Sequence, residues 1–457
     1  MDCTNSLASG GSGSRTVASC ASRVLQRRST DHHYRSRRFT IARPHNGIRH
    51  SGVPFVMIRQ RLGAVLLLCI WVCAGCGSAT SGSPPTPSPA ASGSAATPTA
   101  SPTATSAPQP SCADRVLALM TLDQRIGQLF ELGLAGDGLG ATESNMIRND
   151  HIGSVWFVDR SYAGVAGIRA VAIAVQSQVS SASTANVRFF IAANQEGGLI
   201  QAMQGPGFSR IPTAVVQGTW AAGVLESRAA VWGQELHSAG INLNFAPVMD
   251  VVPPGTDAQN QPIGVLQREY GHDPAAAGSH GTAFLRGMRQ SSIAVTLKHF
   301  PGLGRVAGNT DFTTATDTTT TASDPYLASF GQGVAANADF VMVALAKYTR
   351  IDPNHLAAFS PIVITQMLRT TMGFQGVIVS DDLGDTAAVA SISPATRAID
   401  FLSAGGDMII SKTSAPAAAM VRAIRSRAAT DPGFRQRVDD AALRILRAKQ
   451  AWALLPC

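Results

Sequence analysis

The sequence predicts a parallel (β/α)₈ TIM barrel in a single α/β domain. Eight short apolar runs, rich in β-branched and aromatic residues, alternate with segments of helical length, and no linker interrupts residues 112–457. Because eight parallel strands close such a barrel, we prefer it over an open doubly wound sheet. The expected strands lie within 127–134, 152–158, 187–194, 241–251, 293–300, 338–345, 374–382 and 406–411.

Polar side chains gather at the carboxyl ends of these runs. In a (β/α)₈ barrel this face carries the active site, which is built from strand ends and the loops that follow them. The clustering therefore indicates an enzyme. The residues concerned are Asn194, Glu196, Asp250, Lys298, His299, Asp381 and Asp382.

Several other chemistries lack their sequence motifs. The chain has no GxxxxGK[ST] phosphate loop, no HExxH and no GxSxG, and GLGRVAG (302–308) has the wrong spacing for a dinucleotide fingerprint. The histidines and cysteines show no metal-ligand spacing. We therefore expect neither a metal nor an organic cofactor.

The positive charge of the chain lies in its N-terminal segment. The formal net charge is +8, but residues 1–61 hold eleven Arg against Asp2 and Asp31, so they contribute +9 and the rest about −1. A nearly neutral body removes the main electrostatic support for nucleic-acid binding. We expect no nucleic-acid partner.

Residues 57–75 have the pattern of an export signal. Arg59 and Arg61 precede the apolar run LGAVLLLCIWVCAG (62–75), which is short for a membrane span. We interpret this segment as a lipoprotein signal peptide. Residues 1–56 are then an upstream extension or follow from a wrongly assigned start.

The apolar run ends in VCAGC, which resembles a bacterial lipobox with Cys76 as the lipidated residue, although Cys73 stands where Leu is usual. Secretion without lipid and an uncleaved anchor are the alternatives. Residues 76–111 are dominated by Ser, Thr, Ala and Pro, which predicts a flexible tether. We expect an exported monomer, held by its lipid at the outer face of the cytoplasmic membrane.

Two cysteines belong to the predicted domain, Cys112 at its start and Cys457 at its end. In an exported domain this arrangement suggests one disulfide that joins the termini. Two free thiols are the alternative.

Four ordered motifs resemble glycoside hydrolase family 3. They are QEGG (195–198), NFAPVMDV (244–251), KHFPGLG (298–304) and GVIVSDDLG (376–384). The branch most similar comprises single-domain β-N-acetylglucosaminidases that act on peptidoglycan fragments, including mycobacterial and actinobacterial lipoproteins. The resemblance covers residues 112–457. It implies a TIM barrel and a hydrolase that removes terminal β-linked N-acetylglucosamine with retention of configuration.

Retention requires a carboxylate nucleophile and a nearby proton donor. The nucleophile of the family aligns with Asp381, whereas Asp382 is expected to cap the following turn. The family's loop after KHFPG ends in Asp-Ser-His, an acid/base pair, but this chain has Asn309-Thr310-Asp311. We expect Asp311 to donate the proton. The alternatives are another carboxylate, such as Asp317, or a chain without a working donor.

The resemblance also places Arg268, Lys298 and His299 at positions that bind sugar hydroxyls. Asn194 stands where the family has Asp, and it can still form a hydrogen bond with a hydroxyl. Ala202 stands where the family has Arg, which removes a donor.

Glu196 and Gln195 are expected to support the binding residues, and Asp250 either supports the mouth of the barrel or merely ends a strand. The sequence thus favours a glycoside hydrolase whose partner is a muropeptide-like glycan. The alternative is a catalytically impaired carbohydrate-binding lipoprotein of the cell wall, which keeps the sugar-binding residues but lacks a proton donor.

Overall fold

The computed structural model describes residues 109–136 and 138–457. The expected signal peptide, Cys76 and the tether as far as residue 108 lie outside the described residues, so those assignments stay predictions. Within the described ranges, no helix has the length and apolar character needed to cross a membrane. The same ranges contain no group of three or more His, Cys, Asp or Glu side chains suited to a metal ion.

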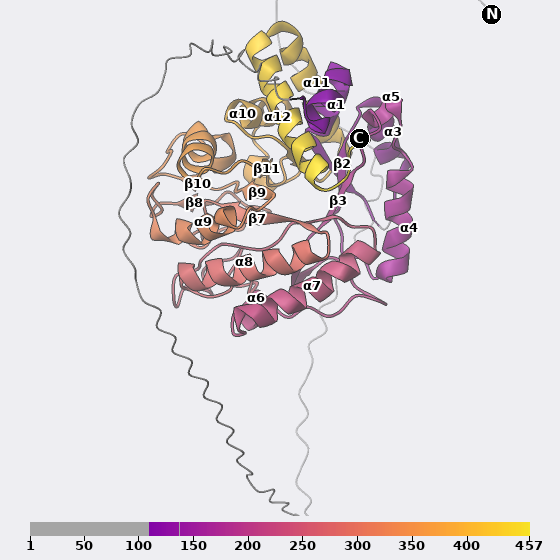
Figure 1. The fold of residues 1–457 in the computed structure, drawn as a ribbon. Helices are drawn as coiled ribbons and strands as arrows, with labels where there is room; N and C mark the ends of the chain where they lie inside the picture. The colour runs from indigo at the N-terminus through magenta and orange to yellow at the C-terminus, as the bar shows by residue number, and fades with distance from the viewer. Residues whose placement is uncertain (1–108, 137) are drawn as a thin grey trace, which may run out of the picture. The chain divides into compact units, whose positions relative to one another are not determined.

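In the described part of the chain, eight parallel strands form the barrel that the sequence predicts (Figure 1). Their order is β11-β9-β7-β6-β3-β2-β1-β12, and a parallel bridge between Val379 and Met408 brings the two ends of this series together. The strands are β1 Phe130–Leu134, β2 Ser154–Phe157, β3 Phe190–Ala193, β6 Leu243–Asn244, β7 Ala294–Phe300, β9 Phe340–Val343, β11 Val377–Ser380 and β12 Ile409–Ser411.

Every residue of these strands is buried. Helices cover the outer face and side chains fill the interior, so the strands are continuous apolar runs rather than alternating ones. Within the barrel, Phe190 and Phe340 meet edge to face, with ring centroids 5.3 Å apart. The run 241–251 forms only a short strand because Pro247 has no N–H for the ladder; pairing resumes where Val248 bridges Lys298.

Helices follow the barrel strands along the chain and cover their outer face, and α7 packs against α8 (Figure 1). The start of α8 shows how the sequence sets a boundary: Asp273 accepts a hydrogen bond from the Ala276 N–H, and Pro274 occupies the first turn. The covering helices are α3 Ala141–Asn149, α4 Gly164–Gln176, α7 Ala222–Ser238, α8 Pro274–Gln290, α9 Ala328–Ala335, η3 Ile362–Thr371, α10 Pro394–Ser403 and α11 Ser414–Thr430.

Shorter elements lie in the connecting loops. The small strands are β4 Gln195–Gly197, β5 Ile200–Gln201, β8 Thr316–Asp317 and β10 Lys347–Tyr348. The short helices are α5 Ser181–Thr184, α6 Ala214–Gln217, η1 Pro325–Leu327, η2 Ala357–Phe359 and η4 Ala387–Val389.

The ends of the domain are joined. The first helix, α1 Cys112–Leu119, packs against the last, α12 Pro432–Ala451, around a small apolar cluster that includes Val116 and Leu446 (Figure 1). Cys112 and Cys457 form a disulfide across this contact. The helix α2 Leu122–Gln128 then leads into β1.

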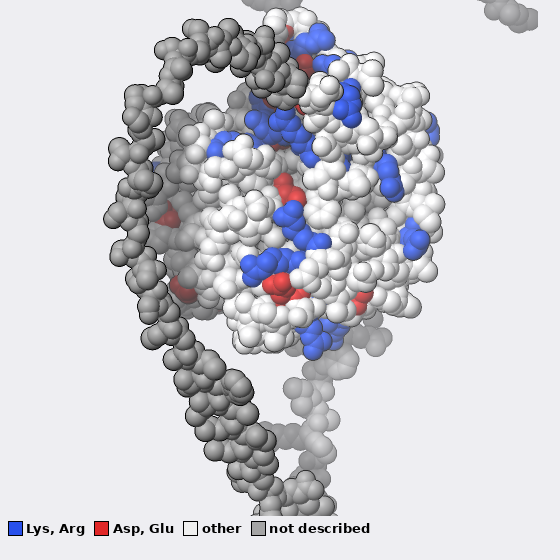
Figure 2. All heavy atoms as spheres, viewed as in Figure 1, with Lys and Arg blue, Asp and Glu red and all other residues white. Residues whose placement is uncertain are grey.

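Basic and acidic side chains lie close to one another on the face drawn in Figure 2, and much of the surface between them is uncharged. This mixed distribution agrees with the nearly neutral charge of the chain beyond residue 61.

We expect the double variant Cys112→Ser/Cys457→Ser to be less stable than the parent by about 3–5 kcal/mol, because the disulfide restricts an unfolded chain over a separation of 345 residues. Chemical denaturation with and without reductant measures this. Reductant should destabilise the parent and leave the double variant unchanged. Equal stability of both proteins in oxidising buffer would contradict the prediction.

Candidate active site

A cavity of about 310 Å³ opens at the carboxyl ends of the barrel strands. This volume lies at the lower end of the range, about 300–1,000 Å³, that is usual for small-molecule sites. The six residues that the sequence assigned to catalysis and substrate binding all line it: Asn194, Arg268, Lys298, His299, Asp311 and Asp381.

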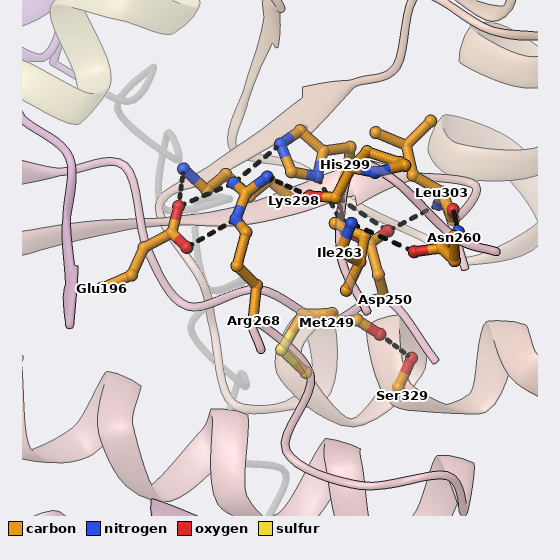
Figure 3. Close-up of polar contacts among 12 residues, drawn as sticks. Glu196, Met249, Asp250, Asn260, Ile263, Arg268, Lys298, His299, Leu303 and Ser329 are labelled. Carbon is orange, nitrogen blue, oxygen red and sulfur yellow. Dashed lines mark hydrogen bonds and ion pairs between the residues drawn. The ribbon is translucent and has the colours of Figure 1, made fainter. Parts of the chain in front are cut away.

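Glu196 is not part of the cavity lining, but it contacts two of the cations that line the cavity, Arg268 and Lys298 (Figure 3). Its carboxylate accepts two hydrogen bonds from Arg268, at 2.8 Å each, and its Oε1 lies 2.5 Å from Lys298 Nζ. Burial alone would raise the pKa of Glu196, but the charges of Arg268 and Lys298 together outweigh it and lower the pKa to about 2. Glu196 is therefore a fixed anion and a supporting residue, as the sequence predicted.

Lys298 also contacts Asn194, a residue that the sequence predicted to bind the sugar. Its Nζ donates a hydrogen bond of 2.8 Å to Asn194 Oδ1, and burial lowers the Lys298 pKa although Glu196 opposes this effect. Lys298 and His299 line the same cavity although they are consecutive in β7, where the pairing with β9 shifts register between Leu297 and Phe300.

Asp250 orients the ring of His299 (Figure 3). It is fully buried, its Oδ2 accepts from Nδ1 of His299 at 2.7 Å, and its Oδ1 accepts from the Leu303 N–H at 2.8 Å. The other ring nitrogen, Nε2, lies 3.5 Å from a guanidinium nitrogen of Arg268, which can only donate. Asp250 thus supports the mouth of the barrel and does more than end a strand.

Asp381 follows the last residue of β11, and its backbone N–H donates to the Val343 carbonyl of β9. Burial raises the pKa of Asp381; His299 opposes this shift, and the charge of Asp311 adds to it. Asp382 has a different environment, because its carboxylate accepts from the backbone N–H groups of Gly384 and Lys412 at 2.8 Å each. Both residues line the cavity, but the carboxylate of Asp382 is occupied in capping the turn.

Hydrogen bonds to the backbone hold the loop that carries Asp311 in place. Asn309 Oδ1 accepts from the Asp311 N–H at 3.0 Å, and the Asp311 carbonyl accepts from the Ala387 N–H of η4 at 3.3 Å. The Thr310 carbonyl accepts in the same way from Ala388, at 3.2 Å. The loop that carries Asp311 is therefore attached to the segment that follows Asp381.

Two other carboxylates, Asp317 and Asp385, differ in whether they reach the cavity. Asp317, the alternative donor, is buried, accepts from the backbone of Thr319 and Thr320, and is not part of the cavity lining. Asp385 is exposed and does line the cavity. Sequence reasoning missed it, although its position four residues after Asp381 was a usable signal.

Aromatic and apolar side chains complete the cavity. Trp156 and Phe245, from the ends of β2 and β6, lie at 5.8 Å between ring centroids, and Met342 of β9 is also in the lining. Lys412 and Phe312 line it as well. Apart from Phe245, which lies in the NFAPVMDV motif, no sequence motif marked these residues, because strands and loops far apart in the chain bring them together.

A (β/α)₈ barrel whose mouth combines carboxylates, cations and aromatic rings is typical of enzymes that act on carbohydrates. The chain belongs to glycosyl hydrolase family 3: residues 121–448 match the description "Glycosyl hydrolase family 3 N terminal domain". This confirms the family that the four motifs indicated, and it makes the protein a glycoside hydrolase.

Relatives with names and structures support the same family. The chain is 31% identical over 290 residues to a beta-hexosaminidase of Stenotrophomonas maltophilia (strain R551-3), covering 61% of this chain and 82% of that protein. It is 44% identical in sequence to a beta-N-acetylhexosaminidase structure from Beutenbergia cavernae DSM 12333, with a TM-score of 0.72 and coverage of 72% and 99%. M. tuberculosis LpqI, 24% identical with a TM-score of 0.62 and coverage of 74% and 96%, shares the fold.

We expect Glu196→Gln to destabilise the protein at neutral pH by about 3 kcal/mol, because it leaves the charges of Arg268 and Lys298 buried together without their anion. The Glu196 pKa is lower in the folded protein than in the unfolded chain, so its stabilisation is complete above pH 4.5 and is lost as the pH falls toward 2.

Denaturant titrations at several pH values measure the free energy of unfolding of parent and variant. The difference between the two should become smaller as the pH falls from 4.5 toward 2. Glu226→Gln is the matched control, because Glu226 pairs with the more exposed Arg286. A Glu196 variant no less stable than this control would contradict the prediction.

Proposed function

We propose that the protein is a retaining β-N-acetylhexosaminidase that removes terminal β-linked N-acetylglucosamine from peptidoglycan-derived fragments or related glycans. The relatives named as hexosaminidases support the sugar. The observation that carries the proposal is the joint position of Asp381 and Asp311 on one cavity, from loops that are hydrogen-bonded to each other.

Asp381 is the nucleophile in this proposal. Its carboxylate attacks the anomeric carbon and forms a glycosyl ester, while the bond to the leaving oxygen breaks. Asp311, protonated at that moment, transfers its proton to the leaving oxygen. As a carboxylate, Asp311 then takes a proton from a water molecule. The oxygen of this water attacks the anomeric carbon and breaks the ester bond, which releases the sugar and restores the carboxylate of Asp381. Because both displacements invert the anomeric carbon, the overall configuration is retained.

The remaining lining residues position the sugar. Lys298 has one N–H left after its contacts with Glu196 and Asn194, and it can donate that hydrogen to a hydroxyl. Arg268 and His299, fixed by Glu196 and Asp250, present rigid polar groups beside it. Rigid donors of this kind orient a substrate without losing side-chain entropy at each turnover.

The charge of Asp311 also bears on the acceptor. A carboxylate at the cavity repels a phosphate anion, so water is the expected acceptor and phosphorolysis is disfavoured. We further propose that the chain is exported, lipidated at Cys76 and monomeric. The sequence pattern of residues 57–111 supports export and lipidation.

One observation favours a second candidate function. The side chain of Asp311 is exposed, and Asn309 stands where the family carries the acidic partner of its proton donor. A barrel that kept Arg268, Lys298 and His299 but protonated poorly would bind glycans at the cell wall without cleaving them.

We expect Asp381→Ala to abolish hydrolysis of every N-acetyl-β-glucosaminide, because it removes the nucleophile. Asp311→Ala should slow cleavage of N,N′-diacetylchitobiose by about 10²–10⁴-fold and affect a 2,4-dinitrophenyl glycoside far less, because that leaving group needs no proton. Azide should speed the turnover of the dinitrophenyl substrate by this variant. Steady-state kinetics on both substrates measure the effect.

Asp385→Asn is the matched control for this experiment, since Asp385 is the other exposed carboxylate of the cavity. If Asp385→Asn and not Asp311→Ala shows the dependence on leaving group, Asp385 is the acid. A parent protein that binds these glycans but cleaves none would support the second candidate.

The pH dependence of kcat/KM tests the electrostatics of Asp381. Activity should fall toward low pH as Asp381 becomes protonated. Asp311→Asn should move this acid limb to lower pH, because the Asp311 charge raises the Asp381 pKa; His299→Gln should move it to higher pH, because His299 lowers that pKa. The dinitrophenyl glycoside is the substrate for these profiles. Shifts of both variants in the same direction would contradict the assignment.

A further inference from the structure

Phe312 is a large apolar side chain at the mouth of the cavity that no role yet explains. It is 81% exposed, yet it belongs to the lining of the cavity. An exposed phenyl ring at the rim of a cavity offers apolar surface that a ligand in the cavity can cover. Its neighbour in the chain is Asp311, the proposed proton donor.

The backbone holds Phe312 in place. The N–H groups of Phe312 and Thr313 both donate to the Asn309 carbonyl at 3.0 Å, and the Asp311 carbonyl accepts from Ala387. The turn is therefore closed on itself and attached to η4. The backbone that carries the ring is therefore preorganised, and only the side chain of Phe312 has to be ordered when a ligand binds.

The proposed chemistry indicates which part of a substrate lies near this ring. The proton donor must reach the oxygen that joins the terminal sugar to the rest of the glycan. Trp156, Phe245 and Met342 come from the strand ends at the base of the cavity, where the terminal sugar must reach Asp381. Phe312, one residue from Asp311 and on the exposed side, is placed to meet the leaving sugar.

We propose that Phe312 is the aromatic platform of the leaving-group subsite and stacks on the apolar C–H face of the pyranose ring that is released. This inference rests on the proposed function, since it takes Asp311 as the donor. It implies that the enzyme prefers glycans with a sugar as leaving group over glycosides with a small one, because only a ring can cover the phenyl face.

The test compares N,N′-diacetylchitobiose with methyl N-acetyl-β-glucosaminide, whose leaving group has no ring. In the full-length protein, Phe312→Ala should lower kcat/KM for the disaccharide about tenfold, chiefly through KM, and change the methyl glycoside less than about twofold. Phe312→Trp should preserve disaccharide cleavage. Val231→Ala, an exposed apolar position on α7, is the matched control and should change neither.

An equal loss on both substrates would overturn the proposal, because Phe312 would then act through Asp311 or the fold; so would an unchanged rate on the disaccharide. If the parent cleaves neither substrate, the proposed function fails, and the platform is judged by binding in the Asp381→Ala background. Calorimetry should then show tighter binding of the disaccharide than of N-acetylglucosamine, and Phe312→Ala should remove that difference. A difference that persists would overturn the platform.

Discussion

Closure of the parallel barrel is the constraint on which the site depends. Asn194, Lys298 and Asp381 lie in or directly after strands that are far apart in the sequence. Only a closed ring of parallel strands brings the carboxyl ends of these strands around one cavity. The closure also acts directly on the catalytic segment. The Lys412 N–H, just after β12, donates to Asp382 Oδ1, so the end of the last strand fixes the turn that presents the proposed nucleophile.

Charge balance at the mouth restricts which residue can donate a proton. Glu196 neutralises Arg268 and Lys298, and with a pKa of about 2 it remains an anion throughout the range in which enzymes usually work. Asp250 accepts hydrogen bonds from three N–H groups, the backbone and ring of His299 and the backbone of Leu303, so its carboxylate is occupied in holding the imidazole. Asp382 also accepts hydrogen bonds from the backbone around it, so the exposed carboxylates of the cavity, Asp311 and Asp385, are the candidates for the proposed proton donor.

The strands could be predicted because burial on both faces gives each one a continuous apolar run; Pro247 explains why one run produced a shorter strand than expected. The site residues at strand ends followed from the barrel and from the family motifs. No sequence pattern showed the side-chain contacts between residues that lie far apart in the chain. Lys449 of α12, for example, donates to Gln128 Oε1 and the Gly153 carbonyl, and burial lowers its pKa to about 7 near the buried Glu131. A charged residue on an amphipathic helix normally predicts a solvent-exposed position.

Asn309 and Asp311, which stand where the family has Asp and His, have one common structural explanation. A histidine donor needs an anionic partner to orient and stabilise its ring, which the family's Asp provides; a carboxylic acid needs none. In this chain Asn309 uses its side-chain oxygen to accept from the Asp311 N–H, so it shapes the turn instead of pairing with a donor. Burial raises the pKa of Asp381 and the charge of Asp311 adds to this shift, so the residue at position 311 also acts on the proposed nucleophile.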